Sequence, residues 1–168
     1  MPKIIENLPQ RLQDEARRQI EEFGYGSLTI RGVAKNCGVG VGTVYNYYRS
    51  KDELVAAFML NDWQEFLQSV RDCSESAASA ESVLRAVYEG LAVFIAQHRK
   101  VFHDEAAAEA FYGSVGRYHA LVRKQLAAPL RRFFEDDFAA EFAAESMLIW
   151  TVEGVPFEKL YELVRKLL

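Results

Sequence analysis

The spacing of three small or apolar residues near the start of the chain constrains its fold more than any other feature. Counting Ile30 as the first of about twenty positions, Ala34 is fifth, Gly38 ninth and Val44 fifteenth. This is the spacing of a helix-turn-helix, because a small fifth residue lets two short helices approach and a glycine at the ninth allows a tight left-handed turn. The fifteenth residue then packs back into the small core between them. The spacing therefore predicts two adjoining short helices.

The second of these helices has an unusual outer side. We expect a first helix over about residues 30–36, capped by the Thr29 side chain, and a second over about 41–48. The second helix offers only Val44 and Tyr48 to a core. Its other side carries glycine, hydroxyl and amide groups: Gly42, Thr43, Tyr45, Asn46 and Tyr47. Such groups suit a helix that lies against the phosphates and base edges of a DNA major groove, whereas packing in a core would leave the spacing unexplained.

The rest of the chain has the apolar period of helices and almost no strand signal. Ser50 followed by Glu53 has the spacing of a capping box and predicts the start of a long helix at that point. The acidic run before Phe138 favours another helix start, and Gly154 favours its end. The fold class predicted from these patterns is all-α.

Charge is distributed unevenly along the 168 residues, whose net charge is −4. Residues 1–51 hold eight Lys and Arg against five Asp and Glu, and the remainder holds 12 against 19. A basic end on an acidic body favours a polyanionic partner for the first part only, although ordinary surface variation would give the same difference. Because no apolar run reaches membrane-spanning length and no signal pattern opens the chain, we expect a cytoplasmic protein without membrane association. Two cysteines, Cys37 and Cys73, fit a reducing compartment.

Residues 16–60 resemble the DNA-binding module of the TetR family of bacterial transcriptional regulators, which are tetracycline-repressor-like. The resemblance is carried by the stretch FGYGSLTIRGVAKNCGVGVGTVYNYYRSKDEL. It follows the family's succession of Gly-aromatic, Thr-apolar-Arg, Gly-Val, Gly-Thr-x-Tyr and Lys-x-x-Leu. The resemblance implies an N-terminal helix-turn-helix domain over residues 1–48 and a helical effector-binding and dimerisation domain over 49–168.

The resemblance also implies a role for each residue of the motif. Phosphate contacts are expected from Tyr45, Tyr47 and Lys51. Contacts near the backbone or a base edge are expected from Thr29 and Thr43. Base-facing positions are Arg31, Val41, Gly42 and Asn46. Physical chemistry gives the same division, because Lys and Tyr position a protein on DNA while Arg and Asn can read guanine and adenine.

Three residues depart from the family pattern. Gly40 stands where Ser or Thr is usual, so the second helix lacks its side-chain cap. Gly32 lies inside the first helix and should loosen it. Tyr48 replaces the usual Phe, and its hydroxyl must therefore find a partner or water.

A helix-turn-helix reader usually works as a dimer, because two half-sites multiply a weak contact. The resemblance places the dimer interface in the last two helices, as a bundle formed by two chains. The residues expected there are Phe142, Ser146, Ile149, Trp150, Leu160, Tyr161 and Val164. The alternative is that these faces only cover their own core.

The resemblance further implies a pocket for a small apolar or amphipathic ligand among the aromatic helices. Candidate lining residues are Trp63, Phe66, Tyr88, Phe102, His103, Phe111, Tyr112 and His119. The alternative is plain core, since aromatic stripes at helical spacing more often fill a core than line a ligand site.

A metal or enzyme interpretation lacks support from spacing. His98 and His103 are five residues apart and do not stack on one helix face, and no phosphate loop or nucleophile elbow is present. We therefore expect no catalytic residue, no metal and no cofactor, although an enzyme built on the same helices stays a third alternative.

The function implied is a sequence-specific DNA-binding transcriptional regulator, a homodimeric repressor released from a near-palindromic operator by a small-molecule ligand. An alternative keeps the dimeric DNA-binding protein and drops the effector, with control by a protein partner or by concentration.

Overall fold

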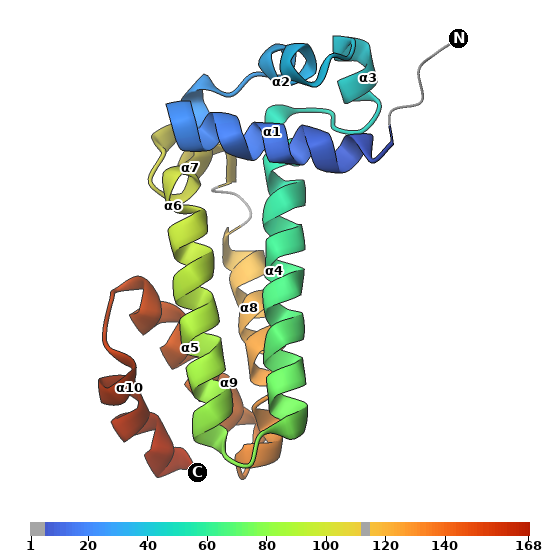
Figure 1. Ribbon diagram of the computed structural model, residues 1–168. Helices are drawn as coiled ribbons and strands as arrows, with labels where there is room; N and C mark the ends of the chain where they lie inside the picture. Colours follow the sequence, from blue (N-terminus) through green and yellow to red (C-terminus); the bar gives the residue numbers. More distant parts are fainter. Residues whose placement is uncertain (1–5, 112–114) are drawn as a thin grey trace. The chain divides into compact units, whose positions relative to one another are not determined.

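The structure, a computed structural model, describes residues 6–111 and 115–168 (Figure 1). All regular elements in these two ranges are helical, which confirms the predicted all-α class. In chain order the elements are α1 Leu8–Phe23, η1 Tyr25–Ser27, α2 Ile30–Cys37, α3 Val41–Tyr45, α4 Lys51–Ser76, α5 Ala80–Gln97, α6 Arg99–Phe102, α7 Glu105–Phe111, α8 Val115–Ala127, η3 Arg131–Phe133, α9 Asp137–Val152, α10 Phe157–Val164 and η4 Arg165–Leu167. Within the described residues, no helix combines the length and apolar character needed to cross a membrane.

The chain packs into two compact units. The first comprises Met1–Asn61 and His98–Tyr112, and the second comprises Asp62–Gln97 and Gly113–Leu168. Helix α4 therefore contributes its first part to one unit and its remainder to the other. The two units group residues by packing rather than by the role expected of each segment. The division into domains 1–48 and 49–168 therefore stays a prediction.

Helix α1 forms because one of its sides is apolar. Leu8, Leu12, Ala16 and Ile20 recur at helical spacing, and all four are buried in the core of the first unit. Pro9 occupies the first turn, where its missing N–H is no loss. The helix runs from residue 8 to residue 23 and packs against α2.

The helix-turn-helix forms as its spacing predicts. The Thr29 hydroxyl accepts a hydrogen bond from Gly32 N at 3.0 Å and caps α2. Gly38 ends α2 at φ 70°, the left-handed conformation that glycine adopts without strain. Val44, on α3, has no exposed surface.

The second helix of the motif is shorter than expected. It was predicted to reach residue 48, but α3 ends at Tyr45 and a turn follows. The N–H groups of both Tyr47 and Tyr48 bond to the Val44 carbonyl, so the chain tightens into a turn that carries Tyr48 into the core. Gly40 starts α3 without a side-chain cap, as predicted.

Helix α4 begins with the expected cap. Ser50 Oγ accepts from Glu53 N at 3.1 Å. The Glu53 carboxylate reaches back to Arg49 N at 2.6 Å, one residue before the position that a standard capping box uses. The start of α4 directly after α3 is thereby fixed by side chains of the same segment.

The segment that contains α6 and α7 belongs to the first unit because it bonds to the turn before α2. One oxygen of Asp104 accepts from Gly26 N at 3.1 Å. Its other oxygen accepts from the N–H groups of residues 106 and 107 at 3.0 and 3.2 Å, which caps α7. Asp104 thus joins α7 to η1.

The core of the second unit is formed by buried residues of the later part of α4 and of α5, α8, α9 and α10. Phe66 lies so close to Gly90 that a Cβ there would come within 2.2 Å of the ring, so glycine is what allows this approach. Asp136 caps α9 by accepting from Ala139 N at 2.7 Å, in agreement with the predicted acidic helix start.

Candidate nucleic-acid interface

The outer side of α3 and of the turn after it carries exposed polar and aromatic groups. Tyr45 is 52% exposed and Tyr47 is 47% exposed, and Asn46 between them is also exposed. Val41 and Thr43 are half-buried. Two large phenols beside a fully buried Val44 mean that this segment has one face in the core and one face in solvent.

Gly42 lies on this face in open space. A Cβ built on it would meet no described atom within 4 Å, and its backbone is not in the left-handed region. Neither internal packing nor backbone conformation therefore explains a glycine at this position. A surface that approaches a partner closely does explain it, because the missing side chain lets the α3 backbone come nearer.

Helix α2 offers Thr29 and Arg31, both exposed. Gly32, predicted to loosen this helix, has a packing reason. A Cβ there would lie 3.0 Å from Gln19 Oε1 and 3.1 Å from the Thr29 hydroxyl, both tighter than ordinary contact. Gly32 thus makes room for the cap of α2 and for the approach of α1.

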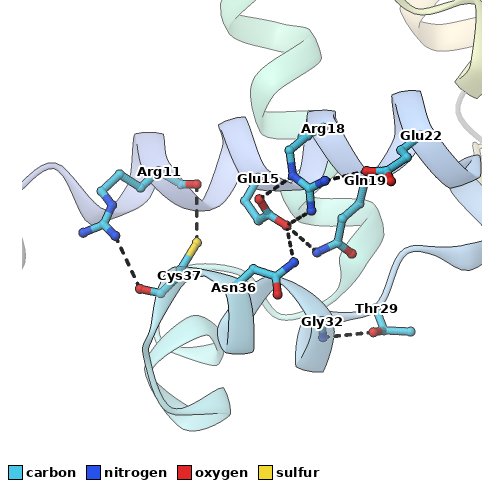
Figure 2. A network of polar contacts seen from close by, with 9 residues as sticks. All are labelled: Arg11, Glu15, Arg18, Gln19, Glu22, Thr29, Gly32, Asn36 and Cys37. Carbon is cyan, nitrogen blue, oxygen red and sulfur yellow. Dashed lines mark hydrogen bonds and ion pairs between the residues drawn. The ribbon is translucent and has the colours of Figure 1, made fainter.

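A carboxylate on α1 holds α2 in place (Figure 2). Glu15 accepts from Arg18 at 2.8 and 2.9 Å, from Gln19 at 2.8 Å and, across to α2, from Asn36 at 2.6 Å. The hydrogen bond from Arg18, with those from Asn36 and Gln19, lowers the pKa of Glu15 from 4.5 to about 2 although partial burial opposes the shift. Glu15 therefore stays ionised and orients Asn36 at neutral pH.

A second pair of contacts joins the same two helices at the C-terminal end of α2, directly after Asn36. Arg11 donates to the Cys37 carbonyl at 3.4 Å, and the Cys37 thiol lies 3.5 Å from the Arg11 carbonyl oxygen (Figure 2). Burial, followed by the charge of Glu15, raises the pKa of the Cys37 thiol. A buried, protonated thiol packs as a small apolar side chain.

Lys51, expected at a phosphate, is half-buried at the start of α4. Its ammonium lies 4.3 Å from the centre of the Tyr25 ring and 3.3 Å from the Tyr25 carbonyl oxygen. The Tyr25 hydroxyl in turn donates to Asp52, and burial raises the pKa of that phenol. The ammonium has three donors, so the carbonyl contact leaves donors to spare.

The Tyr48 hydroxyl, which needed a partner, has one on α1. Gln13 Nε2 donates to Tyr48 Oη at 2.8 Å, and Gln13 Oε1 accepts from Asn61 Nδ2 of α4 at 2.9 Å. Sequence reasoning missed Gln13 and Asn61, as it missed Glu15 and Asn36. The sequence shows that the Tyr48 hydroxyl needs a hydrogen-bond partner. It does not show that the partner is Gln13, because Gln13 and Tyr48 are 35 positions apart.

Residues 12–58, which contain most of α1, all of α2 and α3 and the beginning of α4, match the family model described as "Bacterial regulatory proteins, tetR family". This segment, which contains the helix-turn-helix, is similar to the DNA-binding module of the TetR family. Among curated relatives, an HTH-type transcriptional regulator of Staphylococcus aureus is 24% identical over 99 residues, which are 59% of this chain and 53% of the relative. The HTH-type transcriptional regulator UidR of Escherichia coli is 26% identical over 77 residues, 46% of this chain and 39% of the relative. The matches thus span about half or less of these relatives.

Solved structures extend the TetR likeness to the fold of nearly the whole chain. A TetR transcription regulator from Haloarcula marismortui superposes with a TM-score of 0.60 at 21% identity, covering 94% of this chain and 92% of that one. The TetR family regulator CifR, complexed with 26-bp double-strand operator DNA, gives a TM-score of 0.56 at 16% identity over 99% and 97% of the two chains. At these identities the likeness concerns the fold.

The residues expected to line a ligand pocket fall in different places. Trp63 and Phe66 are buried in the second unit, and their rings meet edge to face at 5.1 Å. Trp63 Nε1 donates to Gln125 Oε1 at 2.9 Å. Tyr88 is half-buried and His119 lies 3.3 Å from Glu145.

Two of the remaining ligand candidates lie in the first unit, and the side chains of the other two fall outside what is described. Phe102 and His103 belong to the first unit, and both are exposed. Tyr112 and the side chain of Phe111 lie outside the described part of the chain. The proposed lining is therefore represented, within the second unit, by Trp63, Phe66, Tyr88 and His119.

The residues expected at a TetR dimer interface divide by exposure. Phe142, Ile149 and Trp150 of α9 are exposed, and Ser146 is half-buried with its hydroxyl on the Phe142 carbonyl at 2.8 Å. On α10 the exposure is lower: Leu160 and Val164 are buried in the core of their own chain, and Tyr161 is half-buried and stacks on Phe157. Helix α9 therefore presents more apolar surface than the expected residues of α10 do.

Proposed function

We propose that this chain is a sequence-specific DNA-binding transcriptional regulator that reads the major groove with α3. The observation that carries the proposal is the two-sided α3 segment: Val44 is fully buried while Tyr45, Asn46 and Tyr47 project into solvent beside the open position of Gly42. A short helix with buried apolar anchors and an outer face of hydrogen-bonding groups is what entry into a major groove requires.

Within that interface, we assign positioning and reading to different side chains. Tyr45, Tyr47 and Lys51 would bond to phosphates, and Thr29 and Thr43 would lie near the backbone or a base edge. Base edges would be met by Arg31, Val41, Gly42 and Asn46. Arg31 and Asn46 have the bidentate geometry that suits guanine and adenine, and each such contact supplies about 1–3 kcal/mol of discrimination.

The proposal includes a homodimer. One α3 is a small reading surface, and two copies about one DNA turn apart, ~34–36 Å, would enter successive major grooves of a near-palindromic operator. The exposed apolar residues of α9 (Phe142, Ile149 and Trp150) support a second copy there, because contiguous exposed apolar surface favours association. The buried Leu160 and Val164 would support that surface from behind rather than touch the partner.

The proposal also includes release by a small apolar or amphipathic ligand bound in the second unit. Its support is the aromatic character of Trp63, Phe66 and Tyr88 together with the family resemblance. A ligand with a preference for another arrangement of α4 would lower DNA affinity by its differential binding energy. The alternative, a dimeric DNA reader controlled by a protein partner or by concentration, differs only in this step.

A selection from random duplex DNA tests the proposal. The purified chain is mixed with a randomised duplex pool at a stated salt concentration, and the bound duplexes are enriched and sequenced. We expect a near-palindrome with two similar half-sites. Recovery of duplexes with no common sequence would contradict the proposal.

The matched control is a chain with three substitutions on the outer face of α3 only: Tyr45→Ala, Asn46→Ala and Tyr47→Ala. These side chains are exposed, so the variant should keep its thermal unfolding midpoint and lose enrichment. Addition of candidate apolar ligands to the enriched complex then distinguishes ligand release from the effector-free alternative.

A further inference from the structure

We infer that Gln13 is a positioning residue for the DNA-reading segment, through a hydrogen-bonded chain that runs from Asn61 on α4 through Gln13 on α1 to Tyr48 behind α3. The inference rests on the proposed function. Its starting observation is that Gln13 is a buried amide, only 7% exposed, with both ends of its amide engaged by residues from other parts of the fold.

The hydrogen bonds of Gln13 depend on direction, whereas apolar packing alone would let the Tyr48 ring shift its position. A buried amide is costly unless its groups are bonded, so Gln13 favours only arrangements in which both partners are in place. One partner, Asn61, is the last residue of the first unit before α4 continues into the second. The other, Tyr48, follows the exposed pair Asn46 and Tyr47 directly.

Tyr48 passes this constraint to Tyr47. The N–H groups of both residues bond to the same carbonyl, that of Val44, and their rings are 6.5 Å apart with a tilt of 39°. Because the hydrogen bond of its hydroxyl fixes the Tyr48 ring, that ring limits the positions open to the neighbouring Tyr47 ring. The Tyr47 hydroxyl is the proposed phosphate donor. Within the described residues, Tyr45 on α3 makes no ring contact with Tyr48, whose ring contact is with Tyr47.

The substitution that separates positioning from folding is a matched pair. Tyr48→Phe alone leaves the Gln13 amide without its acceptor and should lower the thermal midpoint. Tyr48→Phe with Gln13→Met removes both polar groups at nearly constant volume, and should restore the midpoint because no buried donor is left unpaired. If Gln13 positions the reading segment, this double variant should still bind the enriched duplex about tenfold more weakly than the wild type.

A second readout asks whether the effect passes through Tyr47. Tyr47→Phe should weaken binding strongly in the wild-type background and much less in the double variant, since the hydroxyl is no longer held at its phosphate. Tyr45→Phe is the matched control, and its effect should be the same in both backgrounds. Asn61→Ala, at the exposed end of the chain of hydrogen bonds, gives an independent variant and should weaken binding about threefold with the fold retained.

The experiment measures the affinity of each variant for the enriched duplex together with its thermal midpoint. Loss of affinity at an unchanged midpoint, with coupling to Tyr47 and none to Tyr45, supports the inference. Wild-type affinity in the double variant overturns it while leaving the proposed function intact. A wild-type chain that enriches no duplex overturns both.

Discussion

The Lys51 ammonium lies 3.3 Å from the Tyr25 carbonyl oxygen and 4.3 Å from the centre of the same residue's ring. This contact restrains the cation beside η1, at the start of α4 and shortly after the segment proposed to read DNA. A lysine held in one direction loses less side-chain entropy when it meets a phosphate than a freely rotating one does. The contact thus prepares Lys51 for the role we propose.

We expect Lys51→Met to weaken binding to all DNA sequences alike. Methionine keeps most of the apolar stem but removes the charge, so one fewer counterion is released per half-site and the slope of log affinity against log salt falls by about one for each Lys51 that meets a phosphate. Titrations at several salt concentrations measure the slope. Lys166→Met, at the exposed C-terminal end, is the control with the same charge change and should leave affinity unaltered.

Asn46→Ala should instead change sequence preference. Asn46 is exposed, so its loss should leave stability within about 0.5 kcal/mol, while discrimination at one base pair per half-site falls by about 1–3 kcal/mol. Competition among duplexes that differ at single positions measures this. A uniform loss over all positions would show that Asn46 positions the protein rather than reads a base.

Gly42→Ala separates stability from binding in a single substitution. The added methyl group has open space around it and alanine favours helix, so the free protein should be stabilised by up to about 1 kcal/mol. The same methyl group would hold α3 away from DNA, and affinity for the enriched duplex should fall about tenfold. Denaturant unfolding and duplex titration give the two numbers, and unchanged affinity would place the DNA elsewhere.

The helix-turn-helix could be predicted from the sequence because its determinants are local. Thr29, Gly38 and Val44 act within one short segment, and each role follows from residue type and spacing. The length of α3 could not be predicted, since the turn that ends it forms when Tyr48 enters a core built by α1 and α4. The hydrogen-bond partners of Gln13 and the α2 partner of Glu15 could not be predicted either, because they are distant in sequence.

The ionised Glu15 should make stability depend on acid pH. Because its pKa in the folded protein is about 2, below the usual 4.5, the folded state binds the proton less readily than the unfolded state. The stabilisation is therefore fully present above pH 4.5 and is lost as the pH falls towards 2. At neutral pH we expect Glu15→Gln to lower the free energy of unfolding by about 1 kcal/mol, a modest value because Arg18 is half exposed.

Denaturant unfolding of the wild type and Glu15→Gln at a series of pH values measures the difference, which should shrink as the pH falls from 4.5 towards 2. Glu22→Gln removes another partner of Arg18 but no contact with α2, so it should cost only a few tenths of a kcal/mol and keep most of the acid-dependent loss. Because the hydrogen bond described between Glu15 and α2 comes from Asn36, Asn36→Ala in the Glu15→Gln background should add little. A full additive cost for Asn36→Ala would mean that the carboxylate acts within α1 alone and does not hold the helix-turn-helix together.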